Sequence, residues 1–138
     1  MAERKFDVAK SEEEWRQALT PEQFDVLRRH GTEPRGASPQ NREKRSGTFA
    51  CAGCGQELFS SDTKYESGTG WPSFWAPHEQ AVETTEDRSF GMARTEVHCA
   101  RCGGHLGHLF PDGPQPTGRR YCMNGNAMEF HPAKPTSR

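Results

Sequence analysis

Five cysteines are the residues of this sequence that most directly suggest chemistry. Four of them form two pairs with Cys-x-x-Cys spacing, Cys51 with Cys54 and Cys99 with Cys102, whereas Cys122 stands alone. Four thiolates that converge on one point suit Zn²⁺ in tetrahedral coordination, with no open position for catalysis. We therefore expect one structural zinc ion per chain. Two redox-active pairs or an iron centre are the alternatives, but neither pair lies in a βα unit of the thioredoxin type.

The remaining cysteine lies in the segment Arg120-Tyr-Cys-Met-Asn124. If this segment is a strand, Arg120, Cys122 and Asn124 share one face, because side chains alternate between the two faces of a strand. A guanidinium beside a thiol favours the thiolate, and an amide can orient a substrate. These residues predict a nucleophilic cysteine, with a buried and unreactive cysteine as the alternative.

Two histidines in the segment His105-Leu-Gly-His108 could transfer protons near neutral pH. On a regular strand, residues three positions apart point to opposite faces. Both imidazoles reach one site only if the chain bends, which Gly107 could allow. Either histidine could instead be a hydrogen-bonded residue without a catalytic role.

A cluster of aromatic residues follows a glycine-rich turn, in Gly70-Trp71-Pro-Ser-Phe74-Trp75. Such side chains could form the wall of a binding site. They could equally be the core of a small β domain, so the residues themselves leave both readings open.

These side chains must be positioned by short elements, because 14 Gly and 10 Pro in 138 residues favour turns over long helices. Helix-start signals occur only near the N-terminus, at Ser11 with Glu14 and at Thr20 with Gln23, and Gly31 is placed to end the second helix. The best strand candidates follow later, at Val82–Thr85, Thr95–Cys99, His105–Phe110 and Arg120–Asn124.

This pattern predicts one domain over residues 11–130, with a helical segment at 11–31 and a β body at 48–130. Residues 1–10 are expected to be an N-terminal extension and residues 131–138 a flexible tail. With only 31% apolar residues, the domain would gain stability from a metal.

The charge balance, 18 basic against 19 acidic residues, argues against a nucleic-acid binder. No apolar run approaches the roughly 18 residues of a membrane span, and no apolar stretch follows the basic N-terminus as in a signal peptide. We therefore expect a cytoplasmic protein, whose thiols stay reduced and available to a metal.

The B type of methionine sulfoxide reductase is the family that these motifs resemble over residues 13–130. The resemblance rests on both Cys-x-x-Cys pairs, Gly70-Trp-Pro-Ser-Phe74, His105-Leu-Gly-His-Leu-Phe-Pro-Asp-Gly-Pro114 and Arg120-Tyr-Cys-Met-Asn124. It implies reduction of the R epimer of methionine sulfoxide, in peptides or oxidised proteins, to methionine. It also implies a mainly β, tent-like fold of two antiparallel sheets with N-terminal helices.

Roles for individual residues follow from the same resemblance. Cys122 would be the nucleophile. His105 and His108 would both line the site, and either could be the acid; His108 is the preferred proton donor to the sulfoxide oxygen. Asn124 and Arg120 would position groups around the sulfur. Trp71 would receive the terminal methyl group of the substrate.

One departure from the family pattern concerns how the enzyme is recycled. Many members carry a second cysteine in the loop where this chain has Thr69. With four cysteines on zinc, no thiol remains to resolve a sulfenic acid on Cys122, so we expect a one-cysteine enzyme. Its reductant would be an external thiol, either thioredoxin, glutaredoxin with glutathione, or another small thiol.

Two other functions fit the residues. A zinc-stapled β module could bind a protein partner without any reactive thiol. A cysteine hydrolase could use Cys122 with a histidine for acyl transfer. Reactivity of Cys122 with iodoacetamide separates either enzyme from the module, and the choice of substrate separates the two enzymes.

Overall fold

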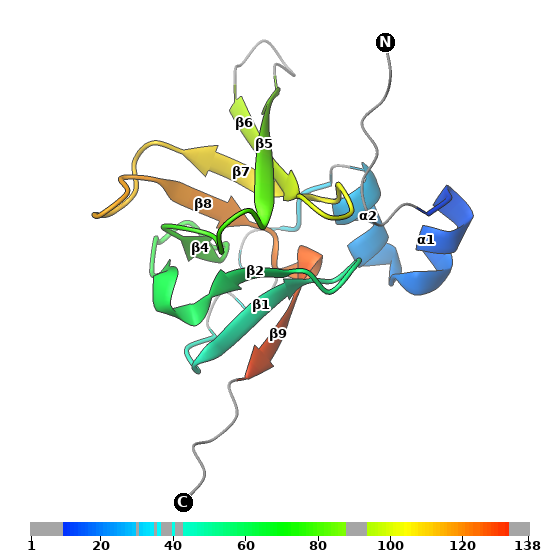
Figure 1. Ribbon diagram of the computed structural model, residues 1–138, viewed down its shortest axis with the longest axis horizontal. Helices are drawn as coiled ribbons and strands as arrows, with labels where there is room; N and C mark the ends of the chain where they lie inside the picture. The colour runs from blue at the N-terminus through cyan, green and yellow to red at the C-terminus, as the bar shows by residue number, and fades with distance from the viewer. Residues whose placement is uncertain are drawn as a thin grey trace, which may run out of the picture.

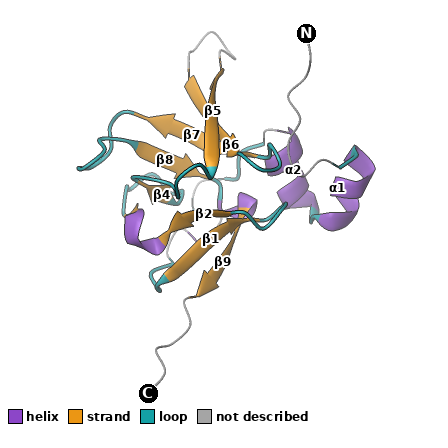
Figure 2. Cartoon of the chain, viewed as in Figure 1, coloured by secondary structure: helices purple, strands orange, loops and turns teal. Residues whose placement is uncertain are grey.

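In the computed structural model, two short helices precede two antiparallel sheets, as the sequence analysis predicted (Figures 1 and 2). The structure describes residues 10–29, 31–34, 36, 40, 43–87 and 94–132. The smaller sheet has three strands in the order β2-β1-β9, and the larger has six in the order β3-β4-β8-β7-β6-β5. This arrangement confirms the predicted fold class.

Both helices begin with the capping interactions that their sequences predict. Helix α1 (Glu12–Ala18) has Ser11 as N-cap, whose hydroxyl accepts from the Glu14 N–H at 3.2 Å while the Glu14 carboxylate accepts from the Ser11 N–H at 2.8 Å. Helix α2 (Pro21–Arg29) repeats the pattern with Thr20 and Gln23. Among the residues that the structure describes, no helix has the length and apolar character needed to span a bilayer.

The smaller sheet consists of β1 (Gly47–Cys51), β2 (Glu57–Ser60) and β9 (Met128–Pro132), none of which was among the best strand candidates. Phe49 at its centre pairs with Phe59 on β2 and Phe130 on β9. Strand β9 continues through Pro132, two residues into the segment predicted as a tail, because that segment pairs with the start of β1. Residues 133–138 and 1–9 lie outside the described ranges.

The larger sheet contains all four predicted strands: β5 (Val82–Asp87), β6 (Arg94–Cys99), β7 (His105–Phe110) and β8 (Arg120–Met123). Two short strands, β3 (Lys64–Tyr65) and β4 (Ser73–Phe74), extend it beyond β8. Strands β7 and β8 are therefore neighbours in the middle of the sheet, and they carry the two predicted histidines and Cys122.

The core fills the space between the two sheets. Phe74 of β4 stacks on Phe59 of β2, with ring centroids 4.4 Å apart, and meets the edge of Phe49 of β1 at 5.1 Å. All three rings are fully buried. The aromatic cluster of the sequence is therefore divided between two roles, since Phe74 belongs to the core whereas Trp71 lies at the site described below.

Candidate metal centre and active site

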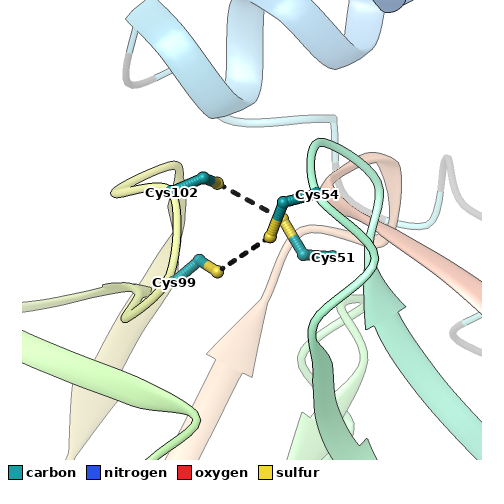
Figure 3. Close-up of side chains that lie close together, drawn as sticks. All are labelled: Cys51, Cys54, Cys99 and Cys102. Atoms are coloured by element: carbon teal, nitrogen blue, oxygen red, sulfur yellow. Dashed lines mark hydrogen bonds between the residues drawn. The ribbon is translucent and has the colours of Figure 1, made fainter. Parts of the chain in front are cut away.

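The four paired cysteines converge from two turns, one in each sheet (Figure 3). Cys51 and Cys54 belong to the turn after β1, and Cys99 and Cys102 to the turn after β6. Each turn closes with a backbone hydrogen bond, from Gly55 to the Cys51 carbonyl and from Gly103 to the Cys99 carbonyl. Both glycines have positive φ, 82° and 77°, a conformation that favours glycine over other residues.

The sulfur positions fit a tetrahedral metal ion. Sulfur separations are 3.7 Å between Cys51 and Cys102 and 3.5 Å between Cys54 and Cys99, and all four sulfurs lie within 4.8 Å of one another. A tetrahedron with zinc–sulfur bonds of about 2.3 Å has edges of about 3.8 Å. The cluster could therefore hold a metal such as zinc, which would tie the smaller sheet to the larger one.

Both helices contact the turns that carry this cluster, and Figure 3 shows a helix above the four cysteines. The Trp15 ring of α1 packs against Gly53, and Leu27 of α2 packs against Gly104. In addition, the Arg28 guanidinium donates to the Cys102 carbonyl at 3.1 Å. The helical segment thus packs on both cysteine turns, which explains how a nine-residue helix is held against the β body.

At the other predicted site, Cys122 and His108 lie directly opposite each other on β8 and β7. Side chains of directly opposed residues share one face of a sheet, with Cβ atoms about 4.5–5.5 Å apart. The neighbours of Cys122 and His108 in the same row are Ser73 on β4 and Glu96 on β6. The thiol and the imidazole that the sequence predicted to cooperate are therefore adjacent.

A β-bulge brings His105 to the same face as His108. On β6, Glu96 pairs with His108 and His98 pairs with His105, so two steps on β6 match three steps on β7, and Leu106 is the extra residue. The imidazole rings of His105 and His108 lie 5.5 Å apart at 69°. The predicted bend is real, and the bulge at Leu106 produces it.

Gly107 was predicted to allow a bend between the two histidines, but its role is to make room for the neighbouring strand. A Cβ atom at this position would collide with the Cys122 carbonyl oxygen on β8. Glycine therefore permits the close approach of the two strands that carry the imidazole and the thiol.

His105 lies deeper than His108. Its side chain is buried, and Nδ1 lies 3.3 Å from the Val26 carbonyl oxygen of α2. Because a carbonyl only accepts, this contact requires the proton on Nδ1.

The groups around Cys122 have opposite effects on the pKa of its thiol. Burial raises the pKa of the Cys122 thiol above its ordinary value, while a hydrogen bond from Thr69 and the positive charge of Arg120 act to lower that pKa. Arg120 therefore favours the thiolate, as predicted, but burial outweighs it. The Thr69 hydroxyl was not foreseen as a contact of the thiol.

Arg120 is itself held in place by two contacts. Its Nε and one terminal nitrogen donate to the two carboxylate oxygens of Asp112, at 2.9 and 3.2 Å. Its guanidinium also lies over the Phe110 ring, 4.4 Å from the centroid. The hydrogen bonds to Asp112 raise the pKa of Arg120, and the same hydrogen bonds, together with the charge of Arg120, lower the pKa of Asp112.

A pocket of about 140 Å³ opens beside the thiol. Its walls combine the apolar surfaces of an indole and a phenyl ring with a thiol, an imidazole and an amide. The residues that line it are Thr32, Trp71, Gly107, His108, Phe110, Cys122, Met123 and Asn124. Among the predicted site residues, Trp71, His108, Cys122 and Asn124 thus line one pocket, whereas His105 and Arg120 do not line it.

The side-chain amide of Asn124 forms hydrogen bonds with two backbone groups. Its oxygen accepts from the Glu33 N–H at 2.9 Å, and its nitrogen donates to the Leu106 carbonyl at 3.0 Å. The amide therefore fixes the end of β8 against the β7 bulge, in addition to lining the pocket.

Glu33 is the main site residue that the sequence analysis missed. Its carbonyl accepts from the Trp71 indole at 2.9 Å, its N–H donates to Asn124, and its carboxylate accepts from the Asn126 N–H at 2.9 Å. It is 3% exposed, although it lies between the predicted helical segment and the predicted β body, where no site residue was expected. Only a pattern spanning residues far apart in sequence could have indicated it, since its partners lie at positions 71 and 124–126.

Comparison with known proteins identifies a family and several relatives of this chain. The SelR domain family matches residues 19–132. The peptide methionine sulfoxide reductase MsrB of Leptospira interrogans is 55% identical over 128 residues, covering 91% of this chain and 96% of the relative. A protein with the same name from Leifsonia xyli is 55% identical over 129 residues, which cover 92% of this chain and 93% of the relative. One from Methanosarcina barkeri is 56% identical over 124 residues, which cover 89% of this chain and 87% of the relative.

Proposed function

Because this chain belongs to the SelR family of peptide methionine sulfoxide reductases, we propose that it reduces the R epimer of methionine sulfoxide, in peptides or oxidised proteins, to methionine. One observation carries the proposal most strongly: Cys122, His108 and Trp71 line the same small pocket. The preference for the R epimer comes from the family resemblance, and each epimer has its own class of enzyme.

In the first step the Cys122 thiolate attacks the sulfoxide sulfur. This attack forms a bond between the two sulfurs while the sulfoxide oxygen takes a proton. The hydroxyl group then transfers to the cysteine sulfur as the sulfur–sulfur bond and the original sulfur–oxygen bond break, so that methionine leaves and Cys122 becomes a sulfenic acid. The sulfoxide sulfur is reduced by two electrons and the cysteine sulfur is oxidised by two, so the step balances with one added proton.

His108 supplies that proton. It lies opposite Cys122 and lines the pocket, so a sulfoxide whose sulfur contacts the thiol has its oxygen within reach of the imidazole. A sulfoxide sulfur is a poor electrophile until its oxygen is protonated or strongly hydrogen-bonded. His105, whose ring contacts His108, orients the donor.

Trp71 receives the methyl end of the substrate. The terminal methyl and thioether of methionine are apolar and polarizable, which suits contact with an indole. The hydrogen bond from the Trp71 indole to the Glu33 carbonyl fixes the ring in place. Asn124 and Arg120 position groups around the reacting sulfur, the former at the pocket wall and the latter beside the thiol.

Recycling of the sulfenic acid uses an external thiol. The other four cysteines lie in the metal cluster, and Thr69 contacts Cys122 where many relatives of this type have a second cysteine. A reductant thiol attacks the sulfenic sulfur, giving a mixed disulfide and water, and a second thiol then releases Cys122. Thioredoxin, glutaredoxin with glutathione, or another small thiol could serve.

The metal proposed for the cysteine cluster is zinc, one ion per chain. Cys51, Cys54, Cys99 and Cys102 would hold it, and its role would be to stabilise the fold.

Turnover of separate R and S epimers of a blocked methionine sulfoxide, with dithiothreitol as reductant, tests this function. Wild-type protein should consume the R epimer only, and Cys122→Ser should consume neither. No turnover of either epimer by a folded, zinc-loaded protein would favour the protein-binding module. Hydrolysis of an ester substrate would favour the cysteine hydrolase.

A further inference from the structure

Three hydroxyl side chains form a connected series beside the Cys122 thiol. Ser73 of β4 lies directly opposite Cys122 of β8, so the two side chains share one face of the sheet. The Ser73 hydroxyl donates to Ser67 Oγ at 2.8 Å, and Ser67 Oγ lies 2.8 Å from Thr69 Oγ1. The Thr69 side chain lies close enough to Cys122 to lower the pKa of its thiol. Ser73, Ser67 and Thr69 therefore make up a hydroxyl chain that ends at the cysteine.

The direction of the hydrogen bonds in the hydroxyl chain follows from how many groups each oxygen can accept. A hydroxyl has one proton to donate and two lone pairs with which to accept. Ser67 Oγ accepts from the Ser73 hydroxyl at 2.8 Å and from the Thr69 N–H at 3.3 Å, which uses both of its lone pairs. The short contact between Ser67 and Thr69 therefore uses the Ser67 proton, and Thr69 Oγ1 accepts it.

The same count leaves the Thr69 proton for another acceptor. Thr69 Oγ1 accepts from Ser67 and from the Trp71 N–H at 3.3 Å, so both of its lone pairs are used. The Trp71 carbonyl is a poor acceptor for the Thr69 proton, because it lies 3.4 Å away, beyond the roughly 2.5–3.0 Å of a good hydroxyl–oxygen bond. A thiolate on Cys122 carries a charge and is the stronger acceptor. The hydrogen bonds thus run from Ser73 towards the cysteine sulfur.

We propose that Ser67 and Ser73 are positioning residues for the Cys122 thiolate, because they turn the Thr69 hydroxyl so that its proton points at the cysteine sulfur. Each hydrogen bond in such a chain polarises the next, so a hydroxyl that accepts from another hydroxyl is the better donor. Burial raises the pKa of the Cys122 thiol, and the Thr69 side chain opposes that rise. The consequence for sulfoxide reduction rests on the proposed function, whereas the effect on the thiol does not.

Charged and titratable groups from several elements also act on Cys122. Substitution of Ser67 or Ser73 changes none of their charges, so a shift in the titration of Cys122 in these variants reports on the hydroxyl chain. The groups are Arg120 on the same strand, whose charge is matched by Asp112; His108 directly opposite on β7, with His105 beside it; Tyr65 on β3; and Glu33 after α2.

The first test measures the pH dependence of Cys122 alkylation by iodoacetamide, with the modified peptide identified by mass spectrometry. Ser67→Ala leaves Thr69 without its donor, so the pKa of the thiol should rise and alkylation at about pH 8 should slow roughly two- to threefold. Ser73→Ala should slow it less, because Ser73 acts one hydroxyl further away. In a Thr69→Val background, Ser67→Ala should have no further effect, since its connection to the sulfur is gone. No slowing in Ser67→Ala, or equal slowing in both backgrounds, would overturn the proposal.

Thr63→Val is the matched control for loss of a hydroxyl. The partly buried Thr63 hydroxyl contacts the backbone carbonyls of Ser60 and Ala76, at 3.1 and 2.9 Å, and is not a member of the hydroxyl chain. This variant should keep the wild-type alkylation profile, and Ser67→Thr, which retains a hydroxyl, should recover part of the rate lost in Ser67→Ala. Equal slowing in Thr63→Val and Ser67→Ala would assign the effect to lost stability and overturn the proposal. Thermal unfolding of each variant is measured alongside.

The second test measures reduction of the R epimer by the same variants. For Ser67→Ala, kcat/KM should fall about two- to threefold near pH 7 and approach the wild-type value as the pH rises, because the thiol then ionises in both proteins. If wild-type protein reduces the sulfoxide but Cys122 is alkylated alike in Ser67→Ala and wild type, the proposed function stands and the role of the hydroxyl chain is wrong. If alkylation shifts as expected but wild-type protein turns over no sulfoxide, the hydroxyl chain stands and the proposed function is wrong.

Discussion

His108 and Cys122 face each other across β7 and β8, and the single glycine between the histidines lets these strands approach closely enough for the two side chains to line one pocket. The proposed nucleophile and the proposed proton donor are thus held by the central strands of a six-stranded sheet, not by loops. Such placement limits their movement, which suits a reaction that needs thiol and proton donor at fixed positions around one sulfur–oxygen bond.

The pH dependence of Cys122 alkylation should reflect its buried position. Burial raises the pKa of the thiol, so in the free protein the thiolate fraction at neutral pH is smaller than for an exposed cysteine, and alkylation by iodoacetamide should accelerate as the pH rises through the elevated pKa. Arg120→Met and Thr69→Val each remove a group that lowers this pKa, and should therefore slow alkylation at pH 8 by about three- to tenfold. The control is Arg101→Met, on the cysteine turn after β6, which should leave the rate unchanged. Faster alkylation in Arg120→Met would contradict the assignment.

Asn124→Ala should lower stability as well as activity. The amide of this buried residue joins Glu33 to Leu106, and its loss leaves the Glu33 N–H buried without an acceptor. We expect a decrease in the free energy of unfolding of about 2–3 kcal/mol, measured by urea denaturation. Cys122→Ser should cost less than about 1 kcal/mol while abolishing turnover. Equal stability of Asn124→Ala and wild type would show that the amide serves only the substrate.

Thr69→Cys should convert the enzyme to a form that resolves its own sulfenic acid. The Thr69 side chain lies close enough to Cys122 to lower the pKa of its thiol, so a thiol at this position would lie near the sulfenic sulfur. After one equivalent of R-sulfoxide without reductant, mass spectrometry should find a disulfide between position 69 and Cys122. Wild-type protein should show none under the same conditions. A persistent sulfenic acid in the variant would contradict the geometry.

Loss of one of the proposed zinc ligands should destabilise both sheets together. Cys102→Ser should lower the zinc content well below one ion per chain, and because zinc binding contributes on the order of 10 kcal/mol to folding in small zinc domains, stability should fall by several kcal/mol. Zinc content by elemental analysis and thermal unfolding are the measurements, with Cys122→Ser as the matched cysteine control. Full zinc content in Cys102→Ser would exclude this residue as a ligand.

Much of the fold could be predicted because its signals are local. Ser11 with Glu14 and Thr20 with Gln23 each form within one helical turn, and β5 to β8 have apolar alternation or cysteine and glycine boundaries. Strands β3 and β4 have only two residues each, so their sequences contain too few positions for a period to be recognised. Strand β9 was interpreted in part as a tail because its pairing partner, β1, lies about 80 residues away in sequence.

The candidate site, like the fold, was predicted only in part. Cys122, His108, Trp71 and Asn124 were predicted from motifs, and the structure brings them to one pocket. The bulge at Leu106, the contact of Thr69 with the thiol and the central position of Glu33 were not foreseen. Each depends on how distant segments meet, which hydrophobic pattern and residue type do not determine.

The most direct test of the central claim is a single turnover without reductant. Wild-type protein mixed with excess R-sulfoxide should form about one methionine per chain, with one added oxygen on Cys122 that a sulfenic-acid reagent traps. Methionine formation without modification of Cys122, or oxidation found on Cys51, Cys54, Cys99 or Cys102 instead, would contradict the account.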